Sequence, residues 1–238
     1  MAACLVVQHG PLERPFAVGD ALLEAGVDLD VRRVDEGQAL PQDLCGFAGV
    51  VVMGGDMSAT SDEGFPSRGA ELALLQEAVA QRVPVLAVCL GAQLLAAAGG
   101  GVAVRGRDGL EVGWLPVTLA PAAAEDPLFA DLPSQLEMLS WHEDTFSLPP
   151  GATLLATGER YRYQAFRLGP SAWGLQFHIE VDVAAVGAWL DALEDEASAV
   201  PGGGAWLRKA TAISAPRLRP HREQLLRRFA ALVAGGTT

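Results

Sequence analysis

Short, continuous runs of apolar residues recur along the first part of the chain. They are rich in Val and Leu and do not alternate with polar positions. The runs are Leu5–Val7, Val50–Met53 and Val85–Val88. This pattern is typical of strands that are buried on both faces, as in a parallel sheet covered by helices.

Helical patterns lie between and after these runs. In Glu71–Val79 the apolar residues Leu72, Leu75 and Val79 recur at a spacing that places them on one helix face. A second apolar stripe near the C-terminus consists of Leu225, Leu226, Phe229, Leu232 and Val233. The charges expected to point into solvent beside it are Arg222, Arg227 and Arg228. We expect this second stripe to dock on the sheet.

The middle of the chain has a different pattern and predicts further short strands. The segments concerned are Trp114–Leu119, Leu136 with Met138, and Thr153–Leu155. Pro201–Gly204 is expected to form a loop and not a linker, because too little chain follows it to build a second core. We therefore expect one domain over residues 1–238, a three-layer α/β/α sandwich. Its central sheet should be mostly parallel and flavodoxin-like, with additional short β connections.

Composition and charge narrow the class of protein. Of the 238 residues, 50% are hydrophobic and 19% are charged, which predicts a globular chain and not a disordered one. The formal net charge is -12. An acidic surface repels phosphates, so we expect neither nucleic acid nor an anionic membrane as a partner.

Three cysteines, Cys4, Cys45 and Cys89, are too few for a disulfide framework and fit a reducing cytoplasm. The N-terminus has no basic leader before its apolar run, so a signal peptide is not expected. The stretch Val83–Val104 carries no charge, but Pro84 and several glycines interrupt it. It reads better as a strand, a turn and a helix than as a membrane span.

Cys89 has the setting of a nucleophile. A buried strand runs directly into it, and a helix-forming stretch follows at once, with small residues at Ala87 and Gly91. This is the arrangement of a strand-to-helix elbow, in which backbone N–H groups can receive an oxyanion. The alternative is a buried core cysteine, which is common. Cys4 and Cys45 lack this setting, so we expect structural roles for both.

A histidine and an acid two residues apart supply a base and its orienting partner. Trp173–Val181 predicts a strand that ends in His178-Ile179-Glu180. Residues two apart in a strand point to the same face, so Glu180 can orient His178 toward the thiol. Gly54 and Gly55 follow the second apolar run and predict either an arm of an oxyanion hole or a tight turn.

Together these segments resemble the class I glutamine amidotransferase family, whose hallmarks are G-x-C-x-G-x-Q and, later in the chain, F-H-x-E. The matching segments are Ala87–Gln93 and Phe177–Glu180, with further similarity in Gly54–Ser58, Glu111–Trp114, Trp141–Phe146 and Gln164–Phe166. The resemblance covers roughly residues 4 to 190 and is strongest to stand-alone GMP-synthase-like amidotransferase domains. Ala87 replaces the usual first glycine, and Ile179 replaces a frequent proline; we expect little effect from either.

The resemblance implies a Cys89–His178–Glu180 triad that hydrolyses the side-chain amide of glutamine, or of a γ-glutamyl compound, through a γ-glutamyl thioester. It implies an oxyanion hole at Gly55 and Leu90 and no cofactor or metal. The residues that it implies for substrate binding are Gly54, Gln93, His142 and Asp144.

Three hypotheses about the function stay open. The first is an amidotransferase subunit that supplies ammonia to a synthase partner and an unidentified acceptor. The second is a self-sufficient γ-glutamyl hydrolase, and the third is a non-catalytic domain that binds glutamine or a partner. An α/β-hydrolase is disfavoured because its acid precedes its histidine in the chain.

Overall fold

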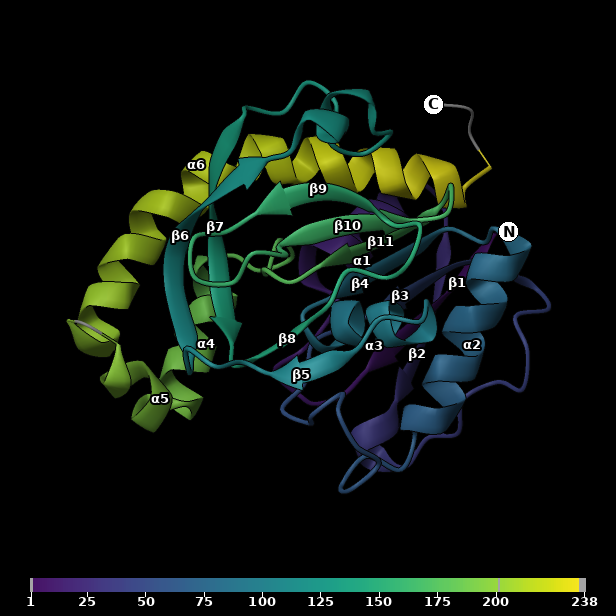
Figure 1. Ribbon diagram of the computed structural model, residues 1–238, viewed down its shortest axis with the longest axis horizontal. Coiled ribbons are helices and arrows are strands. Elements are labelled where there is room, and N and C mark those ends of the chain that lie inside the picture. Colours follow the sequence, from purple (N-terminus) through teal and green to yellow (C-terminus); the bar gives the residue numbers. More distant parts are fainter. Residues whose placement is uncertain (1, 201, 236–238) are drawn as a thin grey trace.

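A computed structural model describes residues 2–200 and 202–235 of the chain. Its main feature is a nine-stranded sheet with helices on both faces (Figure 1). The strand order is β2-β1-β3-β4-β11-β10-β9-β6-β7, and β5 and β8 form a separate antiparallel pair. The three-layer α/β arrangement with a mostly parallel centre confirms the predicted fold class.

The first half of the sheet is parallel. Its strands are β1 (Ala3–Gln8), β2 (Asp28–Arg33), β3 (Phe47–Val52), β4 (Val85–Val88) and β11 (Ala172–Leu175). The antiparallel strands that extend it are β10 (Ala165–Leu168), β9 (Thr153–Thr157), β6 (Glu111–Leu119) and β7 (Gln135–His142). The small pair consists of β5 (Ala103–Arg105) and β8 (Asp144–Phe146). All the strands predicted from apolar runs are present.

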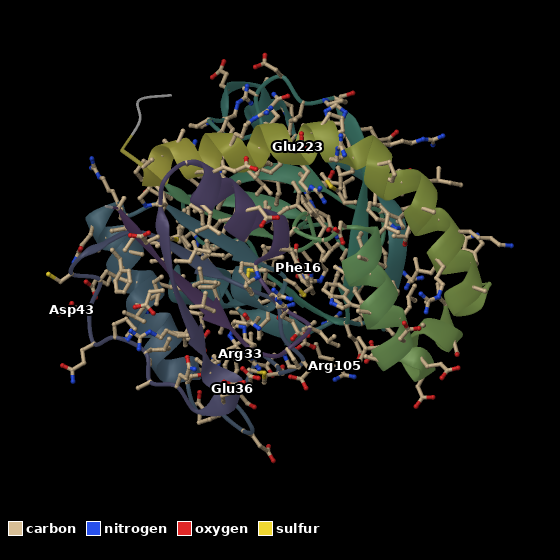
Figure 2. All side chains as sticks on the ribbon, turned by 180° about the vertical axis from the view of Figure 1, so that it is seen from behind. Phe16, Arg33, Glu36, Asp43, Arg105 and Glu223 are labelled. Carbon is tan, nitrogen blue, oxygen red and sulfur yellow. The ribbon has the colours of Figure 1, made fainter. Side chains whose placement is uncertain are left out.

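The helices divide between the two faces of the sheet. One face is covered by α2 (Arg68–Gln81) and α3 (Leu90–Ala98). The other is covered by α1 (Phe16–Glu24), α4 (Val183–Ala192) and α6 (Gly203–Val233), with α1 and α6 in front in Figure 2. The short helix α5 (Glu194–Ala199) packs against α4 and α6. Two short 3₁₀ helices occupy Val34–Glu36 and Pro121–Glu125.

Alternate residues of each parallel strand pack into different cores. In β1, Cys4 and Val6 lie in the core under α1 and α6, whereas Leu5 and Val7 lie in the core under α2 and α3. Both sets are fully buried. This explains why the strand has no polar alternation, because neither of its faces meets water.

The uncharged stretch Val83–Val104 forms β4, the whole of α3 and the start of β5. Within residues 2–200 and 202–235, no helix combines the length and apolar character that a membrane crossing needs.

The helix predicted over Glu71–Val79 is present, but its buried face is shifted. Leu75 is buried as expected, whereas Leu72 and Val79 are only half-buried. The buried face carries Glu71 in addition to Leu74, Leu75 and Ala78. Apolar periodicity could not reveal this face, because one of its residues is a carboxylate.

The C-terminal stripe packs on the sheet within α6, and a Cβ at Gly49 of β3 would lie 2.6 Å from a methyl group of Val233. Figure 1 shows α6 bending along its length, and Pro216 and Pro220 lie inside it.

The expectation of solvated arginines along α6 was wrong for two of the three. Arg222 is buried and donates to the carbonyl oxygen of Val181 at 2.7 Å, and Arg228 pairs with Asp131 at 2.8 Å. The predicted loop at residues 201–204 is also shorter than expected, because α6 begins at Gly203; Pro201 lies outside the described residues.

Candidate active site

The candidate catalytic residues follow the carboxyl ends of adjacent strands. Gly54 lies just beyond β3, Cys89 directly follows β4, and His178 comes three residues after β11. These strands are neighbours in the sheet, in the order β3-β4-β11. Segments far apart in the sequence therefore meet at one edge, where ligands bind in open α/β sheets.

The backbone at Cys89 is the strained elbow that the sequence predicts. Its φ and ψ are 52° and −107°, a conformation that costs a non-glycine residue about 1–3 kcal/mol. The turn is held from the next strand, because the Cys89 N–H donates to the carbonyl oxygen of Leu175 at 2.7 Å. The thiol thus stands at the first turn of α3, whose leading N–H groups have no acceptor within the helix.

Gly91 and Ala87 have different roles in this turn. A Cβ at Gly91 would overlap the carbonyl oxygen of Val52, so only glycine allows β3 and α3 to approach this closely. Ala87 lies in β4 and not in the turn, and its side chain is fully buried in the core under α2 and α3. The methyl group that departs from the family pattern therefore fills space in the core.

His178 and Glu180 meet as expected, but not for the predicted reason. β11 ends at Leu175, and His178 makes only an isolated bridge to Leu139, with its N–H donating to the Leu139 carbonyl oxygen at 2.8 Å. Nδ1 of His178 nevertheless lies 2.7 Å from Oε1 of Glu180. The chain leaves the strand early because backbone bonds hold it to β7 and to α1, where Ala17 donates to the Glu180 carbonyl oxygen. Ile179, between the two, is buried in the core under α6.

The electrostatic environment favours the protonated form of His178. Burial alone would lower its pKa, but the carboxylate of Glu180 and the sulfur of Cys89 outweigh burial, and the pKa of His178 is raised well above its usual value. Within the described residues, Oε2 of Glu180 has no hydrogen-bond partner. His178 therefore has an acid on one side and the thiol on the other, which is the arrangement of a base and its orienting partner.

Gly54 and Gly55 lie so close to neighbouring side chains that a Cβ at either position would crowd them. Neither has a positive φ. A Cβ at Gly54 would lie 3.2 Å from Cε1 of His178, and one at Gly55 would lie 2.8 Å from Cδ2 of Leu90. This favours the oxyanion-arm interpretation over a turn that needs glycine for its backbone conformation.

The thiol opens into a cavity of about 260 Å³. Of the residues proposed for the oxyanion hole and for substrate binding, Gly55, Leu90, Gln93, His142 and Asp144 line it. Leu90, the first residue of α3, and Gly55 thus both line the cavity that holds Cys89.

The polar atoms of the predicted substrate-binding residues are largely engaged within the protein. Gln93 is buried and donates to the carbonyl oxygen of Asp144 at 3.0 Å. The ring nitrogens of His142 lie 3.0 Å from that same oxygen and 3.1 Å from Oε2 of Glu111. Asp144 accepts from Ser58 Oγ at 2.5 Å. These contacts shape the cavity wall and hold the loop between β7 and β8.

Other residues at the site were missed by the sequence reasoning. Trp141 and Trp189 line the cavity, with their rings edge to face at 5.9 Å, and Trp189 also packs against His178. Glu13 lines it too, and burial raises the pKa of its carboxyl group. His9, directly after β1, contacts Gly54. Its position at a strand's carboxyl end is a signal that could have identified it.

Comparison with known proteins agrees with this geometry. The family described as Glutamine amidotransferase class-I matches residues 16–188. A putative glutamine amidotransferase-like protein, YfeJ of Salmonella typhimurium, is 36% identical over 167 residues, covering 68% of this chain and 69% of the relative. Gamma-glutamyl peptidase 5 of Arabidopsis thaliana is 29% identical over 161 residues, covering 66% of this chain and 63% of the relative.

A GMP synthase of Porphyromonas gingivalis is 35% identical over 144 residues, which is 60% of this chain but only 26% of the synthase. Among solved structures, a glutamine amidotransferase from Thermotoga maritima superposes with a TM-score of 0.86 at 31% identity over 98% of both chains. The family model matches residues 16–188, which is nearly three quarters of the chain, and the fold agrees with it; the chain belongs to the class I glutamine amidotransferases.

Proposed function

We propose that this chain hydrolyses the side-chain amide of glutamine, or of a closely related γ-glutamyl compound, with Cys89, His178 and Glu180. The observation that supports it most strongly is the contact of His178 with Glu180 on one side, combined with the raised pKa of His178 that the sulfur of Cys89 helps to produce. A histidine whose raised pKa favours its protonated form, placed beside a cysteine, is the pairing that favours a thiolate nucleophile.

In the first half of the reaction, the thiolate of Cys89 attacks the amide carbon, and a C–S bond forms while the carbonyl electron pair moves to oxygen. The N–H groups of Gly55 and Leu90 are the proposed donors to that oxygen. As the tetrahedral intermediate collapses, His178 gives its proton to the departing nitrogen, and ammonia or an amine leaves a γ-glutamyl thioester.

In the second half, His178 takes a proton from water as the water attacks the thioester. Collapse of this intermediate releases glutamate and regenerates the Cys89 thiolate beside a protonated His178. Glu180 touches no reacting atom; it orients the ring and stabilises its positive charge. Gln93, His142 and Asp144 support the cavity wall, and Gly54 lies against the ring of His178 and the Cβ of Cys89.

Of the three interpretations, we favour a subunit that supplies ammonia to a synthase partner. Relatives include GMP synthase, of which this chain spans about a quarter. The family resemblance implies that subunits of this kind have low glutaminase activity until a synthase binds. We therefore expect weak glutaminase activity in isolation, with kcat well below the roughly 10 s⁻¹ typical of enzymes.

One observation favours the self-sufficient hydrolase as a second candidate. The segment α4–α5 adds Trp189, Leu193 and Glu196 to the cavity wall, and Nε1 of Trp141 donates to Oε2 of Glu196 at 2.6 Å. This wall extends the cavity lining beyond the residues that the resemblance assigns to glutamine binding. A γ-glutamyl peptidase relative also matches the chain over two thirds of its length.

Steady-state release of ammonia or amine from glutamine and from a panel of γ-glutamyl amides, with no partner added, tests the proposal. Cys89→Ala is the control and should abolish turnover. Brisk hydrolysis of one γ-glutamyl compound with glutamine poor would overturn the subunit reading in favour of the hydrolase. Negligible turnover of everything, together with an unreactive Cys89, would contradict the proposed catalysis and favour a binding domain.

A further inference from the structure

A buried histidine contacts the catalytic region from behind. His9 directly follows β1, and its side chain is completely buried. Nδ1 lies 2.9 Å from the carbonyl oxygen of Gly54, and Nε2 lies 2.9 Å from Oε2 of Glu71, whose side chain is equally buried. The proposed reaction gives neither His9 nor Glu71 a role. Each side chain compensates for the burial of the other, because buried ionisable groups must be paired or hydrogen-bonded.

The hydrogen bonds of His9 define which ring nitrogen donates to the backbone. A carbonyl oxygen can only accept, so Nδ1 carries a hydrogen and donates it to Gly54. Nε2 and the carboxyl group of Glu71 share a second hydrogen. The other carboxyl oxygen of Glu71 accepts from Ser67 Oγ at 2.8 Å. The chain Ser67–Glu71–His9 thus fixes the orientation of the ring.

The Gly54 carbonyl that accepts from His9 belongs to the same peptide unit as the Gly55 N–H. This peptide is trans, so its N–H points away from its C=O. His9 holds the C=O and does not line the cavity, whereas Gly55 and Leu90 do. The N–H thus lies on the side of the peptide opposite the bond to His9, and it belongs to a residue that lines the cavity. A hydrogen bond to the C=O also polarises the amide and makes its N–H a stronger donor.

We propose that His9, held by Glu71, is a positioning residue for the oxyanion hole: it orients and polarises the Gly54–Gly55 peptide so that the Gly55 N–H stabilises the charge that develops when Cys89 attacks. This inference rests on the proposed function and adds two residues to its machinery. Glycine at position 55 belongs to the same arrangement, since a Cβ there would lie 2.8 Å from the Cβ of His9.

Two matched variants separate this role from simple packing. In His9→Asn the amide nitrogen lies near the position of Nδ1 and can still donate to Gly54. In His9→Gln it lies near the position of Nε2, so the contact with Glu71 is kept and the donor to Gly54 is lost. Both variants remove the ring, so a purely structural role would affect them alike.

The expected result is a split between the variants. Loss of a whole oxyanion-hole donor lowers kcat by a factor on the order of 10²–10³. His9→Gln only weakens and misdirects one donor, so it should lower kcat about tenfold and change KM little. His9→Asn should stay within about threefold of the wild-type kcat, because the bond to Gly54 is retained.

A second readout needs no turnover. The aldehyde 5-oxopentanoic acid has no α-amino group to cyclise, and Cys89 can add to its carbonyl carbon. The C–S bond forms, the carbonyl electron pair moves to oxygen, and no group leaves. Its affinity, measured by protection of Cys89 from iodoacetamide, reports on the oxyanion hole. Alkylation by iodoacetamide displaces iodide and creates no oxyanion, so its rate reports on the thiol alone.

We expect His9→Gln to weaken aldehyde affinity about tenfold without changing the iodoacetamide rate, and His9→Asn to retain both. All proteins would carry Cys45→Ser, since Cys45 is exposed. Equal aldehyde affinities in the wild type and both variants, or equal losses in both with a parallel fall in the iodoacetamide rate, would overturn the inference. A wild-type protein that hydrolyses no amide would count against the proposed function, whereas the aldehyde comparison would still decide the role of His9.

Discussion

The side-chain amide of Gln176 donates a hydrogen bond to the sulfur of Cys89, with 3.8 Å between nitrogen and sulfur. Gln176 is fully buried, and its oxygen accepts from Gln93 at 3.4 Å, which fixes the orientation of the amide. The glutamine in the family's elbow motif is thus linked to the nucleophile through a second glutamine. A donor aimed at sulfur stabilises negative charge there.

The variant Gln176→Glu tests this contact, because it replaces the donor with an acidic group of the same size. We expect the rate of Cys89 alkylation by iodoacetamide at pH 8 to fall about tenfold or more, since like charges at short range disfavour the thiolate. Gln81→Glu makes the same chemical change at an exposed position on α2 and should leave the rate unchanged. An unchanged rate in Gln176→Glu would contradict the role given to this amide.

Selective labelling distinguishes the three cysteines. A chloroketone analogue of glutamine should label Cys89, and an excess of glutamine should protect it. Cys4 should not react, because burial raises the pKa of its thiol to about 12. Cys45, which sequence reasoning treated as structural, is exposed and should react only with general alkylators. Peptide mapping that places a glutamine-protectable label on Cys4 or Cys45 would refute the assignment of the nucleophile.

Glu180→Gln should shift the pH dependence of catalysis. Burial favours neutral His178, and the carboxylate of Glu180 is the largest of the influences that raise its pKa. Without that charge the pKa of His178 falls, so the alkaline limb of the kcat/KM profile should move to lower pH, and turnover should drop. Cys89 should stay open to alkylation. A variant that keeps full activity and an unmoved alkaline limb would exclude Glu180 from the triad.

The same pKa shift predicts a trend in stability. Because the pKa of His178 is raised in the folded state, its protonation stabilises the fold fully below the unfolded value near 6.5, and this contribution is lost as pH rises through the raised value. We would measure the free energy of unfolding by urea titration at pH values from below 6.5 to above the raised pKa. It should depend less on pH in Glu180→Gln than in the wild type.

Gly55→Ala should damage catalysis by crowding the oxyanion arm. The added methyl group would lie 2.8 Å from both the Cβ of His9 and Cδ2 of Leu90, so the loop must move. We expect kcat/KM to fall by about 100-fold or more, as for loss of an oxyanion donor. Gly69→Ala is the matched control, since it lies exposed on α2 with open space around it and should stabilise the helix by roughly 0.5–1 kcal/mol. Wild-type rates in Gly55→Ala would rule out a tight fit at this position.

The sequence was sufficient to predict four of the five parallel strands and the elbow, because these depend on local pattern. It did not predict β2, which has no continuous apolar run. Continuous apolar runs identify β1, β3 and β4, and a strand that runs into Cys89 before a helix predicts the sharp turn. The pairing of His178 with Glu180 was expected from strand geometry that the chain does not have there. The contact arises instead from backbone bonds to β7 and α1, which are remote in sequence.

The features that escaped prediction depend on buried polar contacts. Glu71 faces inward because His9, about sixty positions away, accepts it as a partner, and this shifts the buried face of α2. Arg222 is buried because its guanidinium reaches the carbonyl oxygen of Val181. Hydropathy assigns such charges to the surface, and only the fold reveals their partners. The roles of the site residues remain predictions that the variants above test.

The cross-strand bond from the Cys89 N–H to Leu175 has a consequence for how the protein loses activity on heating. It ties the elbow to the neighbouring strand at the centre of the parallel ladder, where β4 lies between β3 and β11. The reactive turn therefore belongs to the same cooperative unit as the central sheet and cannot fray independently. In amide hydrogen exchange, the Cys89 amide proton should belong to the slowest class, and thermal inactivation should coincide with global melting.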